Sequence, residues 1–546
     1  MRKVLIVNLT RFGDLLQTSP TIAGLRAAGD TEVTVVVERN FADVCEGIPG
    51  VDRVWPIDLD ALGRLLLADD LRAAYHAVAH ELAALRAERF ALALNYSSSR
   101  MSAVLLRLIG VPDTRGWSMS GDGHRLITHP WSRLFSASCL TRRQAAFNLV
   151  DHYQRVAGIS AGTRRLCFEV PPAARSRVAV LLADGGVGPD QPLVAMQLGA
   201  SRDIRRWPAR HFVAVGRLLH AQLGVRLVLC GGGGDRPMAG EIVAALGPAA
   251  VDCCGRTSIA ELGALLERAD VLLTGDTGPM HMAVAVGTPV VALFFGPALP
   301  VDTGPYAADQ LCLHAPVACA PCDHAITCLN PFCRDVLEPE AVTAAVIARR
   351  AQDWQGLEAA ARRWPRIAWY RTGFDAEGLF DLAPLGGAPP SPAERLRRAH
   401  RALWKGELDG TPPRPVDGPP LAAEGEALRA LAGLARHAAA QATRVERLAG
   451  GDADVEVLEA AGRELEVLDA AIFRHGAIHE AAAQLVQLHR FEKENVLGDD
   501  VAALARATRA QHEALARRAR RLADLVAPRA AATATVEAGG IHAGVA

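Results

Sequence analysis

The sequence predicts an α/β protein with two doubly wound sheets and a C-terminal all-α region. Over the first 345 residues, short runs rich in β-branched residues alternate with helical stretches rich in Ala and Leu. This alternation is typical of parallel βαβ units whose helices cover both faces of a sheet. It starts again near Gln191, and after about Leu421 the pattern is wholly helical. We therefore expect two Rossmann-like domains that face each other across a cleft, followed by helices.

Composition and charge exclude several classes of protein. Half of the 546 residues are hydrophobic and 22% are charged, as in a globular chain of roughly three to four domains. The formal net charge of −1 excludes a strongly basic protein that coats nucleic acid. Residues 277–301 form the longest stretch without Asp, Glu, Lys or Arg, but Gly and Pro interrupt it. We therefore expect no transmembrane segment. With no export signal after Met1, we expect a cytoplasmic protein, and peripheral contact with the inner membrane stays an open alternative.

The first Rossmann-like domain is predicted over residues 1–185. The apolar run at residues 4–8 has the length of a buried strand. Residues 19–28 predict a helix, because Pro20 stands in its first turn, where no N–H is needed. The β-branched run at residues 32–37 predicts the next strand.

The second domain is predicted over residues 186–350 and repeats the same order of elements. Its predicted strands are residues 192–198, 225–230, 271–274 and 289–295, and its predicted helices include residues 209–223 and 279–286. Ligands of such sheets bind beyond the carboxyl ends of the strands. We therefore expect the loops that follow these strands to line the cleft between the two domains.

The remainder of the chain changes in composition. Residues 351–420 are predicted as an aromatic and Pro-rich connecting segment that packs on another part of the protein. Residues 421–528 predict a bundle of three Leu-rich helices, the second acidic and the third basic. Attraction between these charges favours a bundle, and a basic face for anionic lipid headgroups is the alternative. The tail at residues 529–546 is predicted to be disordered.

The loop after the predicted strand at residues 271–274 carries the clearest chemical signal. The backbone N–H groups of Thr277 and Gly278 open a helix that has Pro279 in its first turn. Such a helix N-terminus binds a diphosphate through free N–H groups and the helix dipole. Asp276 can cap this helix or accept a hydrogen bond from a sugar or ribose hydroxyl. An ordinary strand–turn–helix connection explains the same residues.

Three other loops offer polar groups at expected strand ends. Ser201, Arg205 and Arg206 follow one strand, where arginine can bind a phosphate through two hydrogen bonds. Asp14 follows the first strand, where a carboxylate can take a proton from an acceptor hydroxyl. Asp235 follows four glycines and can reach a ribose. The alternatives are a solvated basic loop and carboxylates that satisfy backbone groups.

Four cysteines lie close together in a predicted loop at residues 319–333. Cys319, Cys322, Cys328 and Cys333 have the spacing C-x2-C-x5-C-x4-C. Four thiolates can enclose zinc, iron or an iron–sulfur cluster. Such an ion would be structural rather than catalytic, and four reduced thiols are the alternative.

Several motifs taken together resemble glycosyltransferase family 9, the heptosyltransferases. They are residues 11–20 (RFGDLLQTSP), 201–208 (SRDIRRWP), 275–283 (GDTGPMHMA), 287–294 (GTPVVALF) and 303–306 (TGPY). The resemblance extends over about residues 1–345, and the DTGPMH run is its most specific part. It implies a GT-B fold, an ADP-heptose donor, inversion at the anomeric carbon and no cofactor needed for catalysis.

The resemblance also implies roles for individual residues. Asp14 is the implied catalytic base, and Arg205 stands where the family usually has a lysine that steadies the diphosphate. The implied donor-binding residues are Thr10, Gly13, Ser201, Arg206, Asp235, Asp276, Thr277, Gly278 and His281. The cysteine loop is similar to the iron-binding cysteine finger of the protein-modifying autotransporter heptosyltransferases, although its spacing differs. The helical region after about Leu421 has no counterpart in the lipopolysaccharide enzymes.

The sequence leaves donor and acceptor open. The acceptor hydroxyl can belong to the lipopolysaccharide core, to another surface glycan or to a protein. A GT-B transferase with another sugar nucleotide is one alternative to a heptosyltransferase. A non-catalytic GT-B scaffold whose helical region binds a partner is another, although the presence of both Asp14 and the turn at Asp276 argues against it. The oligomeric state is not encoded in any pattern that we recognise.

Overall fold

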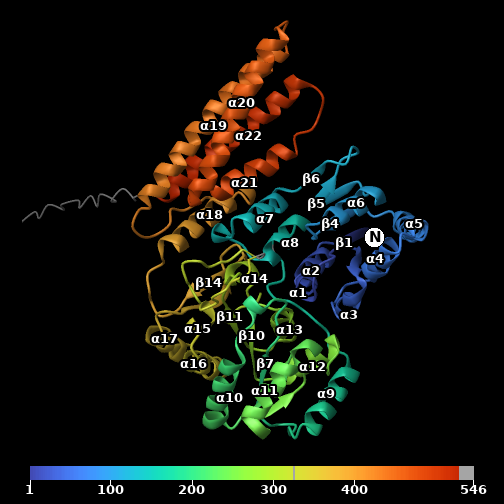
Figure 1. Cartoon of the computed structure of the whole chain (residues 1–546), viewed down its shortest axis with the longest axis vertical. Helices are drawn as coiled ribbons and strands as arrows, with labels where there is room; N and C mark the ends of the chain where they lie inside the picture. The colour runs from blue at the N-terminus through green and yellow to red at the C-terminus, as the bar shows by residue number, and fades with distance from the viewer. Residues whose placement is uncertain (161, 324–325, 528–546) are drawn as a thin grey trace, which may run out of the picture. The chain divides into compact units, whose positions relative to one another are not determined.

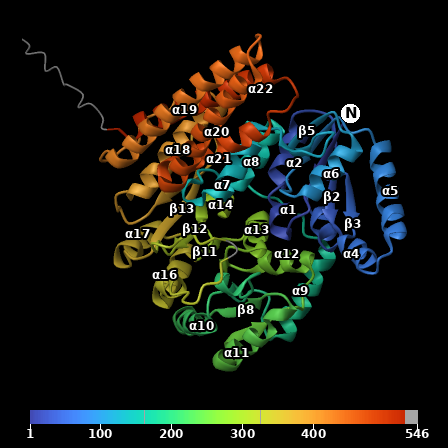
Figure 2. The same cartoon turned by 45° about the horizontal axis from the view of Figure 1, so that its top comes forward.

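The computed structural model describes residues 1–160, 162–323 and 326–527. The chain forms two compact units, Met1–Pro389 and Pro390–Ala546 (Figures 1 and 2). The predicted disordered tail at residues 529–546 lies outside the described residues. In the described part of the chain, no helix combines the length and apolar character that crossing a membrane requires.

The first sheet has the strand order of a Rossmann fold. Its order is β3 (Arg53–Ile57), β2 (Thr31–Glu38), β1 (Arg2–Val7), β4 (Leu92–Asn95), β5 (Asp113–Met119) and β6 (Arg125–Ile127). All neighbours are parallel except β5 and β6. The order reverses between β1 and β4, and such a switch point opens a crevice at the carboxyl ends of the two strands.

The helices of this first half are short, and several have clear boundaries. Ser99 caps α6 through the Ser102 N–H, and Gly110 ends it in the left-handed conformation. The helices are α1 (Phe12–Leu16), α2 (Ser19–Ala27), α3 (Ala42–Glu46), α4 (Leu59–Leu67), α5 (Leu71–Ala87), α6 (Arg100–Ile109), α7 (Pro130–Leu140), α8 (Leu149–Ala157) and α9 (Pro172–Asp184).

The second sheet repeats this order and extends it by a hairpin. Its order is β14 (Phe380–Pro384), β13 (Ala368–Phe374), β12 (Leu311–His314), β11 (Val290–Phe294), β10 (Val271–Gly275), β7 (Leu193–Gln197), β8 (Arg226–Cys230) and β9 (Ala250–Asp252). Strands β7 to β12 are parallel, whereas β13 and β14 are antiparallel additions at the edge. The switch point lies between β7 and β10.

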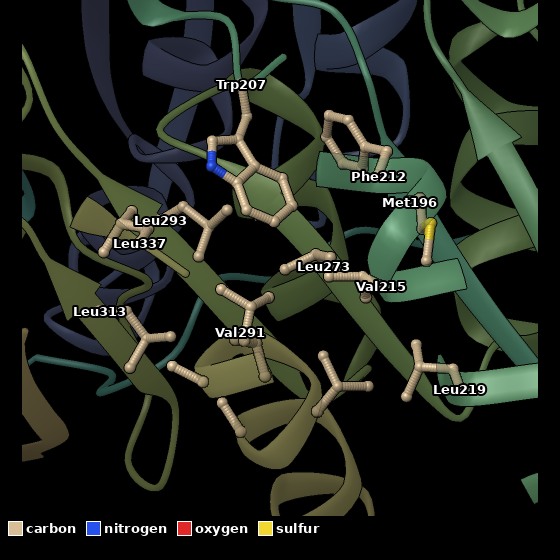
Figure 3. Packing of buried hydrophobic residues seen from close by; sticks show 14 of the residues in the cluster. Met196, Trp207, Phe212, Val215, Leu219, Leu273, Val291, Leu293, Leu313 and Leu337 are labelled. Carbon is tan, nitrogen blue, oxygen red and sulfur yellow. The ribbon is translucent and has the colours of Figure 1, made fainter. Parts of the chain in front are cut away.

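Helices of the second half pack on this sheet and bury a large apolar core. The helices are α10 (Ala209–Leu223), α11 (Arg236–Leu246), α12 (Ile259–Arg268), α13 (Gly278–Val286), α14 (Pro300–Thr303), α15 (Cys333–Val336), α16 (Pro339–Arg350) and α17 (Trp354–Arg363). Figure 3 shows Phe212 and Leu219 of α10 facing Leu273 and Val291 of the strands, with Trp207 above them. Each side chain of this size stabilises the fold by about 1.5–3 kcal/mol when it is fully buried.

Residues 351–420 do not form a separate connecting segment. They are divided between the two units. The hairpin β13–β14 belongs to the second sheet, and its Trp369 and Phe380 are fully buried. The aromatic composition of the segment therefore reflects strands inside a core. Helix α18 (Pro392–Leu408) belongs to the second unit.

The second unit is all-α, as predicted, and its described part has more helices than predicted. Besides α18 it contains α19 (Ala422–Ala449), α20 (Val455–Ile478), α21 (Glu480–Glu494) and α22 (Val501–Leu525). Helices α19 and α22 run side by side in both views (Figures 1 and 2). Several basic residues of α22 form ion pairs inside the unit: Arg506 pairs with Glu446 at 2.7 Å, and Arg518 pairs with Glu492 at 2.8 Å.

Candidate active site

A cavity of about 850 Å³ lies in the first unit, where loops from both sheets meet. Its walls include the loops after β1, β7 and β10, which are the strands beside the two switch points. Of the eleven predicted catalytic and donor-binding residues, nine line it: Gly13, Asp14, Ser201, Arg205, Asp235, Asp276, Thr277, Gly278 and His281. The predicted base and the predicted phosphate-binding turn therefore share one cavity.

Asp14 stands in the first turn of α1, just after β1. Its carboxylate accepts weak hydrogen bonds from the Arg11 backbone N–H and the Gln17 side chain, both at 3.5 Å. Burial raises the pKa of Asp14, and the negative charge of Asp276 raises it further, against hydrogen bonds from Thr10 and Arg11 that lower it. A carboxylate with a raised pKa is a stronger proton acceptor once it is ionised, as a general base requires.

The N-terminus of α13 also lines the cavity, next to the first turn of α1. Thr277 is the N-cap residue, but its hydroxyl does not cap the helix and lies 3.2 Å from the Thr274 hydroxyl. Among the described residues, nothing accepts a hydrogen bond from the backbone N–H of Thr277 or Gly278. Pro279 has no N–H. The positive end of the helix dipole and two open donors thus face the cavity, which favours an anionic ligand.

Arg205 and Asp276 form a clamp beside this helix terminus. Arg205 Nη2 donates to Asp276 Oδ2 at 2.7 Å, and the Thr303 hydroxyl donates to Asp276 Oδ1 at 3.0 Å. Both carboxylate oxygens of Asp276 are therefore used, so Asp276 holds Arg205 rather than capping α13. The buried Nε of Arg205 has no hydrogen-bond partner in the described part of the chain. Arg205 also lines the cavity, so its guanidinium brings a positive charge to this wall and favours an anionic ligand.

Asp235 occupies a cradle of glycines at the rear of the cavity. Its Oδ2 accepts a hydrogen bond from the Gly232 N–H at 2.9 Å, and a Cβ on Gly199 would lie only 2.2 Å from it. Arg206 Nη2 donates to Asp235 Oδ1 at 3.2 Å. The other two predicted donor-binding residues, Arg206 and Thr10, do not line the cavity. Each contacts a residue that does: Arg206 bonds to Asp235, and Thr10 bonds to Asp14.

The two halves of the cavity touch through a pair of glycines. A Cβ on Gly278 would lie 2.2 Å from the ring of Phe12, and a Cβ on Gly13 would lie 3.0 Å from the ring of His281 and 3.1 Å from Gly278 Cα. Any larger residue at Gly278 would have to displace α1 or the Phe12 ring. The glycines let the first turn of α1 lie directly against the first turn of α13.

His281 is a buried, neutral histidine at this junction. Burial lowers its pKa to about 4. Its Nδ1 has no hydrogen-bond partner among the residues that the structure describes. A neutral imidazole can donate or accept one hydrogen bond to a ligand without adding charge.

Sequence reasoning missed the aromatic wall of the cavity and the contacts that close it. Phe41, Phe135 and Phe147 line the side formed by the first half of the chain. Arg142 Nη2 donates to Asp302 Oδ2 at 2.9 Å and so joins the two halves. These residues lie far apart in the chain and in no motif, so only the folded structure brings them together. Thr303 also lines the cavity, and the TGPY motif that contains it could have identified it from the sequence.

The cysteine loop has one feature that favours a bound metal ion and one that does not. Burial raises the pKa of Cys322, and the neighbouring thiols of Cys319, Cys333 and Cys328 raise it further. This mutual repulsion is what a bound cation would relieve, and four thiolates suit iron or zinc. In the described residues, however, no three of these sulfurs form a group within 4.8 Å of one another. A structural ion here remains a prediction.

Comparisons with known proteins agree with the geometry. Residues 79–332 match the family model described as Glycosyltransferase family 9 (heptosyltransferase). A lipopolysaccharide heptosyltransferase 3 of Escherichia coli is 27% identical over 289 residues, which is 52% of this chain and 80% of the relative. A lipopolysaccharide heptosyltransferase 1 of Pseudomonas aeruginosa is 26% identical over 326 residues, which is 59% of this chain and 86% of the relative.

A solved structure of a glycosyl transferase family 9 protein from Veillonella parvula supports the fold. It aligns with a TM-score of 0.54 and 22% identity, over 64% of this chain and 98% of that one. The predicted GT-B fold is thereby confirmed, with two parallel-dominated sheets around a shared cavity. The chain is therefore a glycosyltransferase that resembles the heptosyltransferases of family 9, with an added C-terminal helical region.

Proposed function

We propose that the chain transfers a heptose from ADP-heptose to a hydroxyl group, with inversion at the anomeric carbon. The observation that supports this most directly is that Asp14 and the N-terminus of α13 line the same cavity. An inverting displacement needs a base on one side of the sugar and a stabilised leaving group on the other. The heptose itself is inferred from the names of the relatives.

The donor diphosphate binds at the second sheet. As the glycosidic bond breaks, the departing ADP gains negative charge at its terminal phosphate. The N–H groups of Thr277 and Gly278 and the guanidinium of Arg205 stabilise that charge more in the transition state than in the ground state. Asp235 is the proposed ribose contact, and it would accept a ribose hydroxyl in addition to the Gly232 N–H and Arg206.

The acceptor binds at the first sheet. Asp14 removes the proton from its hydroxyl as the oxygen attacks the anomeric carbon. Phe41, Phe135 and Phe147 offer an apolar surface, typical of small-molecule pockets, to the rest of the acceptor. The acceptor is a lipopolysaccharide core sugar, another surface glycan or a protein side chain. All eleven cysteines are unpaired, which suits a reducing cytoplasm.

The donor is tested by nucleotide release. The full-length protein is incubated with ADP-heptose, ADP-glucose and a set of UDP-sugars, and released nucleotide is measured for the wild type and Asp14→Asn. We expect release from ADP-heptose that depends on Asp14. Release from a different sugar nucleotide would identify another GT-B transferase. Absence of both release and donor binding would refute the proposal.

The acceptor is tested in cells. Mass spectrometry of surface glycans and of surface proteins compares a deletion strain with the strain carrying the wild-type gene or Asp14→Asn. Loss of a single heptose from one of these classes, in both the deletion and the variant strain, identifies the acceptor. Unchanged glycans and proteins in the deletion strain would contradict a heptosyl acceptor at the cell surface.

A further inference from the structure

Three side chains from three helices of the second unit meet in a buried cluster. Asp469 lies on α20, His489 on α21 and His512 on α22. One ligand atom from each of them lies within 4.8 Å of the other two. Both histidines are fully buried, and Asp469 is nearly so.

His489 has an unmet hydrogen-bonding requirement. Neither of its ring nitrogens has a hydrogen-bond partner among the described residues. A neutral imidazole carries a lone pair on one of its two ring nitrogens, which can bind a metal ion. A buried polar group without a partner costs about 1–3 kcal/mol. The rings of His489 and His512 lie 4.8 Å apart between centroids, so His489 belongs to the same cluster.

His512 is held between two acceptors. Its Nδ1 lies 2.9 Å from the Thr508 carbonyl oxygen, and its Nε2 lies 2.8 Å from Asp469 Oδ1. A neutral imidazole has one N–H, whereas the Thr508 carbonyl and the Asp469 carboxylate oxygen both only accept. In either tautomer, one ring nitrogen would therefore face an acceptor oxygen with its lone pair. This contact needs a positive species, either a second ring proton or a metal ion.

The surroundings match those of a metal ligand set. Ligating histidines usually donate their second N–H to a backbone carbonyl, as His512 would to Thr508, and ligating carboxylates are themselves hydrogen-bonded. Here the ammonium of Lys493 donates to Asp469 Oδ2, and Oδ1 lies 2.8 Å from His512 Nε2, so an ion would bind between these two atoms. The positive charge of Lys493 weakens cation binding but does not occupy the ligand atoms.

We propose that Asp469, His489 and His512 bind a divalent first-row transition ion, with Zn²⁺ the first choice. Two imidazole nitrogens and one carboxylate oxygen suit zinc, and a water completes the tetrahedron. With metal–nitrogen distances of about 2.0–2.1 Å, ligand atoms lie about 3.3 Å apart, so the side chains need only small adjustments. The ion would cross-link α20, α21 and α22. This inference is independent of the proposed transferase reaction.

The test separates this cluster from the cysteine loop. The full-length chain with all four loop cysteines changed to Ser is stripped with a chelator and titrated with Co²⁺, whose visible spectrum reports its ligands. We expect one bound equivalent with nitrogen–oxygen coordination and no thiolate charge-transfer band. His489→Gln and His512→Gln should each weaken binding by at least about tenfold. His437→Gln, at an exposed position of α19, is the matched control and should bind as the parent does.

A second variant protects the test against misfolding. Lys493→Met keeps all three ligands and removes a nearby positive charge, so we expect Co²⁺ and Zn²⁺ to bind more tightly. Zn²⁺ should also raise the melting temperature of this variant, because an ion that binds the folded state alone stabilises it. If neither the cysteine-free parent nor Lys493→Met binds an ion, the cluster is an ion pair of protonated His512 with Asp469 and Lys493, and the proposal is wrong.

Discussion

Gly278→Ala tests whether close contact between the two halves of the cavity is required for catalysis. The added methyl would lie 2.2 Å from the Phe12 ring, whereas ordinary contact begins at 3.4 Å. The overlap of about 1 Å can be relieved in two ways. Either α1 moves away from α13, or the Phe12 ring rotates into the cavity that it lines.

Both outcomes impair the reaction while the fold stays intact. A shift of about 1 Å between Asp14 and the phosphate-binding turn should lower kcat/KM by roughly 10²-fold. A rotated Phe12 ring would instead raise KM for the donor. The steric overlap should cost about 1–3 kcal/mol of stability, and the higher helix propensity of Ala offsets at most about 1 kcal/mol of that loss.

The assay is steady-state transfer with thermal melting measured in parallel. Gly275→Ala is the matched control, because Gly275 ends β10 three residues earlier and its Cβ would lie 3.7 Å from the nearest atom outside its chain neighbours. We expect wild-type activity for Gly275→Ala and a large loss for Gly278→Ala in a protein that is still folded at the assay temperature. Equal activity of the two variants would show that the proteins work without this contact and would refute the argument.

Three further predictions concern the base, the clamp and the core. Asp14→Asn should lower turnover by roughly 10²-fold or more, while calorimetry should show unchanged ADP binding. The activity of the wild type should fall as the pH drops through the raised pKa of Asp14. An unchanged turnover in Asp14→Asn would show that Asp14 is not the base. Arg205→Gln should weaken donor binding by about tenfold or more. Arg205→Lys should recover part of the lost affinity, because lysine restores the positive charge. Equal donor affinities of the two variants would show that the charge of Arg205 does not contribute to binding. Leu273 is fully buried in β10, so Leu273→Ala should lower the free energy of unfolding by about 2–5 kcal/mol. A loss below about 1 kcal/mol in denaturant titration would contradict the packing in Figure 3.

The parts of the fold that depend on local pattern could be predicted. The helix expected at residues 209–223 is α10 (Ala209–Leu223), and the strand expected at residues 271–274 is β10 (Val271–Gly275). Apolar strands between helices leave few alternative topologies, because parallel connections are right-handed and both faces need cover. Loops that follow strands at a switch point then meet in space, so the sequence could predict that Asp14 shares a cavity with Thr277.

Features that depend on long-range contacts could not be predicted. Asp276 bonds to Arg205, which lies 71 positions away in the chain, and neither alternative considered for Asp276, a helix cap or a sugar contact, included this partner. The hairpin β13–β14 was not recognised, because its aromatic residues are compatible with any packed segment. The cluster at Asp469 joins three helices, and its His489 and His512 look like ordinary residues of an amphipathic helix when each helix is considered alone.

The electrostatics of the cavity link donor binding to base strength. The negative charge of Asp276 already raises the pKa of Asp14 across the contact between α1 and α13. A bound diphosphate brings further negative charge to the same wall, and by Coulomb's law it raises the pKa of Asp14 again. If Asp14 is the base, as proposed, it should accept a proton more readily when the donor is bound. Release of ADP should then lower the pKa of Asp14 again and return the proton to water.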